Sequence, residues 1–245
     1  MPTIHQQQPF DLVHHPIKET IFMLTSLLEK ITKTNDRLQS HKETTTGQLT
    51  CFHARAIPSI DIEAYLLRIL KYCPCTNECF LSLLIYFDRM AQNTTQLRLD
   101  SFNIHRLIIS GIMVASKFFS DVFYTNIRYA KVGGIPVKEL NVLELEFLRM
   151  NDFKLYIKVE ELQKYGDQLL MHHRREQQRL QQHQQHHQYI ITKNVDISYT
   201  HHNNKSSSHH YSICQSYHRL PTPPLESDHH HSSPNNTTSN YLVHC

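Results

Sequence analysis

Three cysteines that lie close together are the first residues of the chain that could do chemistry. Cys73, Cys75 and Cys79 have a spacing that could place thiolates on a zinc ion. A zinc site needs a fourth ligand, however, and none stands at a suitable spacing. One of the thiols could instead pair with His105 as nucleophile and base, but no motif of a Cys–His enzyme surrounds them. Small buried side chains at a helix junction explain the cluster better, so we predict no catalytic site, no metal site and no cofactor.

Two isolated charges point to binding chemistry. Lys117 is the only charge in the apolar run 107–120, and Glu144 interrupts a second apolar run at 140–147. A charge on a largely buried helix needs a partner or a route to water. The two side chains could therefore form an internal ion pair, Lys117 could extend its ammonium group to the surface, or both could contact another protein.

The composition divides the chain into an apolar part and a polar tail. Residues 57–171 are rich in Leu, Ile, Val, Phe and Tyr, whereas residues 172–245 are rich in Gln, Ser and Asn and hold 14 of the 20 histidines. Only the first part can bury enough apolar surface to offset the entropy lost on folding. We therefore predict a disordered low-complexity tail over 176–245, without the defined spacing of a metal site.

Charge and hydropathy argue against two classes of partner. The formal charge of +3 is small and spread along the chain, which gives no basic face for nucleic acid. The longest apolar stretch, 107–119, is interrupted by polar residues and is shorter than the ~20 residues of a membrane span. The N-terminal residues carry no signal-peptide pattern. We predict no nucleic acid and no membrane as partners, and a location in the nucleus, the cytoplasm or both.

Apolar residues at three- and four-residue spacing, with no strand pattern, predict an all-α fold. A first helix is expected at about 17–38, within an N-terminal segment 1–54. Five helix-length segments follow between Pro58 and Met150, with Ser59 as the expected N-cap of the first and Asp61 in its first turn. The third segment, 101–120, is apolar or small on nearly every face and is expected at the centre of a helical bundle. A further helix could follow at 161–175.

Four stretches carry longer patterns: LIISGIMVASKFFSD (107–121), IPSIDIEAYLLRILKYCPC (57–75), VFYTNIRYAKVGGI (122–135) and ELNVLELEFLRMNDFKLYI (139–157). The ASKF core of the first resembles the third helix of cyclins in general. The other three resemble the fungal phosphate-pathway (Pho-type, or P/U-type) cyclins. The resemblance covers about 55–160 and implies a single cyclin box, a five-helix bundle, between the N-terminal helix and the tail.

This resemblance implies a regulatory subunit and not an enzyme. A cyclin docks beside the mobile αC helix of a cyclin-dependent Ser/Thr kinase and holds it where its Glu can pair with the Lys that positions ATP. The cyclin contributes no catalytic group and favours the active arrangement through differential binding. The implied partner is a Pho-type kinase in phosphate or nutrient signalling, with a kinase inhibitor protein and phosphorylation substrates as further candidates. The alternatives are a P/U-type cyclin for glycogen, polarity or cell-cycle substrates, and a cyclin-fold scaffold that binds a kinase without activating it.

The family match also implies roles for individual residues near the third helix. Lys117 and Glu144 match the Lys of the third helix and the Glu of the fifth helix that contact the kinase around αC. Phe118 and Phe119 are adjacent, so one of the two rings is expected at the kinase interface unless both lie in the core. Asp121 could reach a kinase Arg, with the capping of a helix end as the alternative.

The stretch specific to the subgroup supplies further candidates. A kinase or substrate surface is expected to include Tyr124, Asn126, Arg128, Tyr129 and Lys131, with a polar loop and a solvated helix as the alternative. Gly133 and Gly134 are expected to form a tight turn that requires a positive φ. The first box helix lacks the Met-Arg-x-x-Leu patch of many cell-cycle cyclins, and the chain has no Trp, so the usual Arg-x-Leu docking site is not expected.

Overall fold

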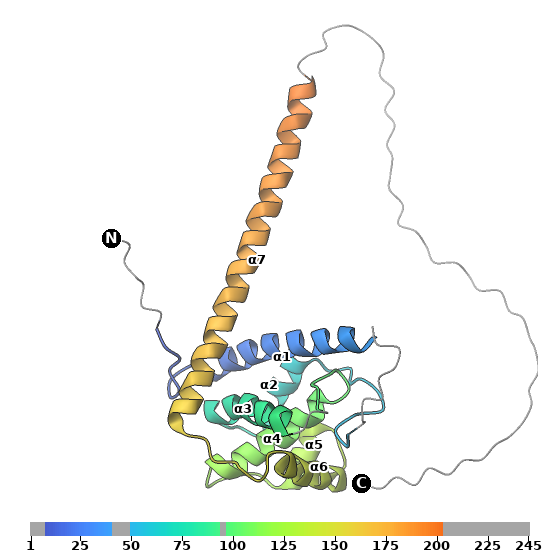
Figure 1. The fold of residues 1–245 in the computed structure, drawn as a ribbon, viewed down its shortest axis with the longest axis vertical. Helices are drawn as coiled ribbons and strands as arrows, with labels where there is room; N and C mark the ends of the chain where they lie inside the picture. Colours follow the sequence, from blue (N-terminus) through green and yellow to red (C-terminus); the bar gives the residue numbers. More distant parts are fainter. Residues whose placement is uncertain (1–7, 41–49, 94–96, 203–245) are drawn as a thin grey trace, which may run out of the picture. The chain divides into compact units, whose positions relative to one another are not determined.

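Seven α-helices, and no strand, occur in the residues that the structure describes. This computed structural model describes residues 8–40, 50–93 and 97–202, with side chains described up to residue 187. In chain order, the helices are α1 (Ile17–Ser40), α2 (Ile62–Tyr72), α3 (Asn77–Asn93), α4 (Ile104–Phe119), α5 (Asn126–Gly133), α6 (Val137–Met150) and α7 (Val159–His202) (Figure 1). The all-α prediction is therefore confirmed. The chain divides after His183 into two units, and the packing described below belongs to the first.

The start of α2 is fixed by a side-chain cap. Oδ1 of Asp61 accepts a hydrogen bond from the backbone N–H of Ala64 at 2.7 Å, which satisfies one of the free donors of the first turn. The expectation that Ser59 is the N-cap was wrong, because α2 begins at Ile62 and the residue directly before it takes that role.

The ends of α5 follow the same chemistry. Thr125 accepts from the backbone N–H of Arg128 at its start. Gly134 ends the helix with a φ of 71°, in the left-handed region that glycine adopts without strain. The predicted turn with positive φ is thus present, at the second of the two adjacent glycines.

Helix α4 lies at the centre of the bundle, as its apolar sequence predicts. It contacts α2, α3, α5 and α6 (Figure 1). Every residue from Ile104 to Ser116 is buried except Arg106. A Cβ atom at Gly111 would collide with the side chains of Leu83 on α3 and Phe147 on α6. The missing side chain therefore lets three helices approach one another closely.

A buried polar junction joins the N-terminal segment to α3. Thr20 on α1 donates its hydroxyl to Oδ1 of Asn77 at 2.9 Å, and Nδ2 of Asn77 donates to the carbonyl of His15 at 2.8 Å. Both Thr20 and Asn77 are buried. The apolar stripe of α1 packs against α2 and α3 beside this junction. The first helix is therefore part of the bundle.

The Asn77 junction gives a prediction about stability. Changing Asn77→Ala should lower the free energy of unfolding by about 1–3 kcal/mol, because buried polar groups at Thr20 and His15 lose their partner. Asn93→Ala is the matched control, since this exposed amide also donates to a carbonyl, that of Met150 at 3.0 Å. Urea unfolding should show a loss below about 1 kcal/mol for the control. Equal losses in the two variants would contradict this account of the junction.

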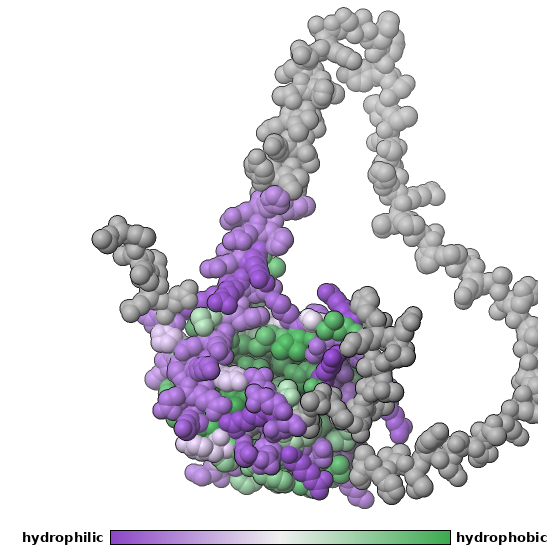
Figure 2. Space-filling view, in the orientation of Figure 1, coloured by the Kyte–Doolittle hydropathy of each residue, from purple (hydrophilic) through white to green (hydrophobic). Residues whose placement is uncertain are grey.

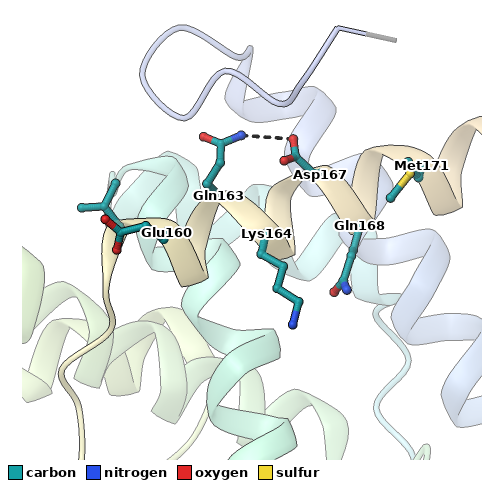
Figure 3. Close-up of a pocket in the computed structure, with 7 residues that line it drawn as sticks. Glu160, Gln163, Lys164, Asp167, Gln168 and Met171 are labelled. Carbon is teal, nitrogen blue, oxygen red and sulfur yellow. Dashed lines mark hydrogen bonds between the residues drawn. The ribbon is translucent and has the colours of Figure 1, made fainter. Parts of the chain in front are cut away.

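Helix α7 is attached to the bundle through the N-terminal segment. The backbone N–H of Phe10 donates to Oδ1 of Asp167 at 2.7 Å, and Nε2 of Gln163 donates to the carbonyl of Phe10 at 2.7 Å. Gln163 also donates to Asp167 at 3.1 Å, and both side chains point toward the N-terminal segment (Figure 3). The buried Phe10 ring lies so close to Gly166 that a Cβ there would collide with it.

The length of α7 differs from the prediction. The sequence predicts a helix ending near residue 175 and disorder beyond it, yet α7 continues to His202. Residues 168–202 contain neither Pro nor Gly, and Gln, Arg and Leu are favourable helix residues. Side chains 177–187 are exposed, and this stretch is almost entirely hydrophilic (Figure 2). Residues 203–245 of the expected tail lie outside the described residues. No described helix is both long and apolar enough to cross a membrane.

His105 links the start of α4 to the segment before α2. Its Nε2 lies 2.8 Å from the carbonyl oxygen of Ile60, and its ring packs edge-on against Tyr65. The neutral ring donates from Nε2, and its Nδ1 is buried without a partner. Burial lowers the pKa of His105, and the hydrogen bond and the nearby Asp61 oppose that shift only in part.

This burial predicts a pH dependence of stability. The pKa of His105 is lower in the folded protein than in the unfolded chain, where it is about 6.5. Below about pH 6.5, the unfolded chain therefore binds more protons at this position than the folded protein does. The stability that neutral His105 contributes is therefore complete above about pH 6.5 and is lost as the pH falls below it. The free energy of unfolding, measured with urea, should fall less between about pH 7.5 and about pH 5.5 for His105→Gln than for the wild type. Burial also lowers the pKa of His172, but this residue is present in both proteins. An equal fall in the free energy of unfolding of the two proteins would therefore contradict the role of His105.

Candidate functional site

A cluster of four polar side chains joins the end of α4, the start of α5 and the middle of α6. Nζ of Lys117, in the last turn of α4, lies 2.6 Å from Oε1 of Glu144 on α6. Oε2 of Glu144 accepts from Nδ2 of Asn126, the first residue of α5, at 2.8 Å. The same amide group lies 2.8 Å from Oδ1 of Asn141. Lys117, Asn126, Asn141 and Glu144 are called the polar cluster below.

The chemistry of the polar cluster suits binding and not catalysis. The internal ion pair that the sequence left as one alternative is present, yet the Lys117 and Glu144 side chains remain 26% and 19% exposed. Both carboxylate oxygens of Glu144 have partners, whereas an ammonium group carries three donors and Glu144 takes one. The remaining N–H groups of Lys117 are available to carbonyl oxygens such as those at the C-terminus of a partner helix.

Exposed apolar side chains adjoin the members of the polar cluster. Phe118 follows Lys117, Ile127 follows Asn126 and Leu145 follows Glu144 in the chain. The exposed large apolar side chains of this region are Phe118, Val122, Phe123, Ile127, Val142 and Leu145. Exposed apolar side chains on the elements that carry a polar cluster suit a protein-binding surface. We call these side chains and the polar cluster together the α4–α6 surface.

The two adjacent phenylalanines have different surroundings. Phe118 is 43% exposed, whereas Phe119 is half-buried and packs against the core. The rings meet edge to face with centroids 5.1 Å apart. Phe118 is therefore the more exposed of the two rings, and Phe119 packs against both Phe118 and the core.

The other expected site residues have different surroundings, and Tyr129, which was expected on a kinase or substrate surface, is buried. Asp121 is exposed just after α4 and makes no hydrogen bond or ion pair with any described residue. The guanidinium group of Arg128 lies over the Tyr124 ring, 4.1 Å from its centroid, and Nε donates to the carbonyl of Tyr72 at 2.8 Å. Tyr124 and Arg128 thus connect α5 to the end of α2, away from the polar cluster.

The cysteines of the α2–α3 junction are ordinary thiols in this structure. Cys73 and Cys79 are buried, Cys75 is half-buried, and all three are free. The hydrogen bond between Cys75 and Cys79 raises the pKa of the first and lowers that of the second. Within the residues described, no group of three or more His, Cys, Asp or Glu side chains could hold a metal ion.

Sequence reasoning did not select several members of this surface. Asn126 stands in the stretch that was expected on a kinase or substrate surface, but its hydrogen bond to Glu144 was not predicted. Val122 and Phe123 could have been recognised, because two apolar residues directly after a helix end, among polar neighbours, have no helical stripe to join. Leu145 has the spacing of a second stripe on α6 and is not distinguishable from a core residue by sequence.

Comparison with known proteins gives the family. The family model described as Cyclin matches residues 18–155, more than half of the chain. The chain belongs to the cyclin family. As a cyclin, it is a non-catalytic regulatory subunit of a cyclin-dependent protein kinase. The matched region starts in α1, whereas the sequence placed the cyclin box at about 55–160, and the packing of α1 on α2 and α3 gives the physical reason for including it.

Relatives of this cyclin are found in fungi and plants. PHO85 cyclin-like protein psl1 of Schizosaccharomyces pombe is 48% identical over 178 residues, covering 69% of this chain and 73% of the relative. PHO85 cyclin-7 of Saccharomyces cerevisiae is 46% identical over 178 residues, covering 65% of this chain and 62% of the relative. Cyclin-U4-1 of Arabidopsis thaliana is 41% identical over 149 residues, covering 61% and 73%. The expected resemblance to Pho-type cyclins is thereby confirmed.

Proposed function

We propose that this cyclin binds and activates a cyclin-dependent kinase of the Pho85 type through the α4–α6 surface. The observation that carries the proposal is the Lys117–Glu144 pair, held by Asn126 and bordered by exposed apolar side chains. Two relatives that share 46–48% of the aligned residues are named PHO85 cyclins, which supports the kinase class.

The surface offers contacts that a mobile kinase helix could satisfy. Two N–H groups of Lys117 are available to main-chain carbonyls, and Phe118 supplies an aromatic anchor next to them. Glu144, itself held by Asn126, keeps the ammonium group in place before binding, so little side-chain entropy is lost on association. A kinase conformation that makes all of these contacts is favoured over one that makes few, and this difference in binding free energy activates the enzyme.

Two further residues are assigned roles in the same complex. Asp121 is exposed and free to form a charge-assisted hydrogen bond with a kinase Arg. Phe119, which packs beneath Phe118, positions that ring and does not itself contact the kinase.

We propose phosphate or another nutrient signal as the input, phosphorylation of Ser or Thr before Pro in the substrates, and a kinase inhibitor protein as a further partner. The complex would act in the nucleus, the cytoplasm or both. Glycogen, polarity and cell-cycle substrates are the alternative outputs.

A binding and activation assay tests the proposal. The full chain is mixed with a purified Pho85-type kinase, and affinity and phosphorylation of a Ser-Pro peptide are measured separately. Binding with a large increase in activity is the expected result. Binding without an increase would identify a scaffold, and the absence of both would overturn the kinase assignment. Asp121→Asn is a useful variant, because it should reduce activation more than affinity.

A further inference from the structure

A groove runs between α2 and α5. It has a volume of about 1000 Å³. Its apolar part includes Leu67 on α2 and Ile127 and Val132 on α5, so Ile127 belongs both to this groove and to the α4–α6 surface. Thr125 and Tyr72 lie at the ends of the two helices. We call it the α2–α5 groove.

The charges that line the α2–α5 groove all have one sign. Arg68 and Lys71 come from α2, and Arg128 and Lys131 come from α5. No acidic side chain is among the residues that line it. None of the four basic groups forms an ion pair with a carboxylate in the part of the chain that the structure describes. Four uncompensated positive charges therefore face one hollow.

Several of these basic side chains are held in place by uncharged partners. Nε of Arg128 donates to the carbonyl of Tyr72, and Nη2 of Arg68 lies 3.4 Å from the carbonyl of Lys131. The ammonium group of Lys71 lies 5.3 Å from the centroid of the Tyr72 ring. Each of these contacts leaves further N–H groups of the side chain unused. The side chains therefore keep both their charge and free donors, which suits them to an anion.

The walls of the α2–α5 groove are firmly connected. Helices α2 and α5 pack directly against each other. The hydroxyl of Tyr65 donates to the carbonyl of Gly133 at 3.3 Å, and a Cβ at Gly133 would collide with Ile109 of the central helix. The spacing of the two basic rows is therefore fixed by the bundle itself.

We propose that the α2–α5 groove binds an acidic peptide segment of a partner protein. The occupant is an extended chain that places one apolar side chain against Leu67 and Val132 and anionic side chains on either side of it. Charge complementarity selects this occupant, because a basic or neutral segment would leave four positive charges close together without compensation. The anion can be a carboxylate or a phosphoryl group on Ser or Thr, since guanidinium groups bind both.

Peptide binding to the full-length chain tests this proposal without any kinase. The probes are a fluorescent peptide with Asp and Glu around a central Leu, the same peptide with one Asp replaced by phosphoserine, and a charge-reversed version with Lys. Fluorescence anisotropy should show binding of the two acidic peptides that weakens with salt, and no binding of the Lys peptide. Tighter binding of the phosphoserine peptide would identify phosphate as the preferred anion, and equal binding would identify carboxylate.

Charge reversal in the α2–α5 groove provides the decisive comparison. Arg68→Glu with Lys131→Glu should weaken binding of the acidic peptides by at least about tenfold, since two attractions become repulsions. Lys18→Glu with Lys164→Glu is the matched control, because it makes the same change in net charge at two exposed positions away from the groove. All four side chains are exposed, and thermal melting should give similar transitions for both variants.

Three results would overturn the proposal. The first is equal binding of the acidic and Lys peptides, and the second is an equal loss in the control variant. The third is self-association of the chain that the groove variant abolishes, without binding of any peptide, which would assign the groove to a second copy. None of these results depends on the kinase, so they are independent of the proposed function.

Discussion

Changing Lys117→Ala and Glu144→Ala together is expected to weaken binding to a Pho85-type kinase by about 30-fold or more, equivalent to about 2 kcal/mol. The two charges form the centre of the α4–α6 surface, and their removal takes away the N–H donors of Lys117 and the acceptor that positions them. Affinity for the kinase and its activity at saturating cyclin should be measured separately. Activity at saturation should fall less than affinity, because the remaining apolar contacts still favour the active conformation.

A charge swap separates the contact with the kinase from the internal ion pair. In Lys117→Glu with Glu144→Lys, the two side chains can still pair, and the Asn126 amide can present its oxygen to the new ammonium group. The stability of the swap variant should therefore stay within about 1 kcal/mol of the wild type. Its affinity for the kinase should remain as low as that of the double alanine variant. Recovery of affinity in the swap variant would show that the pair acts only within the cyclin.

Changing Phe147→Ala is expected to lower the free energy of unfolding by about 3–5 kcal/mol. The Phe147 ring is fully buried, meets Tyr86 and Phe87 edge to face and lies against Gly111 of α4. Its removal leaves a cavity where three helices meet, and the close approach at Gly111 prevents the bundle from collapsing into it. Urea unfolding monitored by circular dichroism measures the loss.

Leu145→Ala is the matched control for Phe147→Ala. Leu145 lies two residues earlier on α6 and is 43% exposed, so its removal should change stability by less than about 1 kcal/mol. The same variant should weaken kinase binding, since this side chain adjoins the polar cluster. We assign one side of α6 to the core and the other side to the partner. This assignment would be contradicted by equal destabilisation in the two variants. It would also be contradicted if Leu145→Ala left the affinity for the kinase unchanged.

The central helix shows what local sequence is able to predict. The run 107–119 is apolar or small at almost every position, and such a segment has no stable place except inside a bundle. Burial of α4 follows directly. The N-cap of α2 was placed at Ser59 and not at Asp61, because sequence locates the first residue of a helix only to within a few positions.

The C-terminal helix shows where composition misleads. Repeated Gln and His residues favoured disorder, but the same residues include good helix formers and no breaker between 168 and 202. One tertiary contact also lies just past the predicted end, where Lys30 on α1 forms an ion pair with Glu176 at 3.0 Å. A contact between positions so distant in the chain leaves no local signal.

The candidate site was only partly predictable for a similar reason. Lys117 and Glu144 were recognisable as isolated charges, and the family match gave them a role. Asn126 was expected on a kinase or substrate surface, but its hydrogen bond to Glu144 was not predictable, because it depends on the Thr125 cap that starts α5 at that residue. Arg128 was expected on a kinase or substrate surface, and its stacking on Tyr124 places it in the α2–α5 groove instead of beside the polar cluster.

Amide hydrogen exchange of the full chain, with and without a saturating Pho85-type kinase, tests the central claim most directly. The account predicts slower exchange at residues 116–128 and 141–148, which carry the α4–α6 surface, because the kinase excludes water there. Exchange in α1 and in the N-terminal half of α7 should be unchanged. Protection of α1 and α7 with no change at 116–128 and 141–148 would contradict the account and place the kinase on another face of the cyclin.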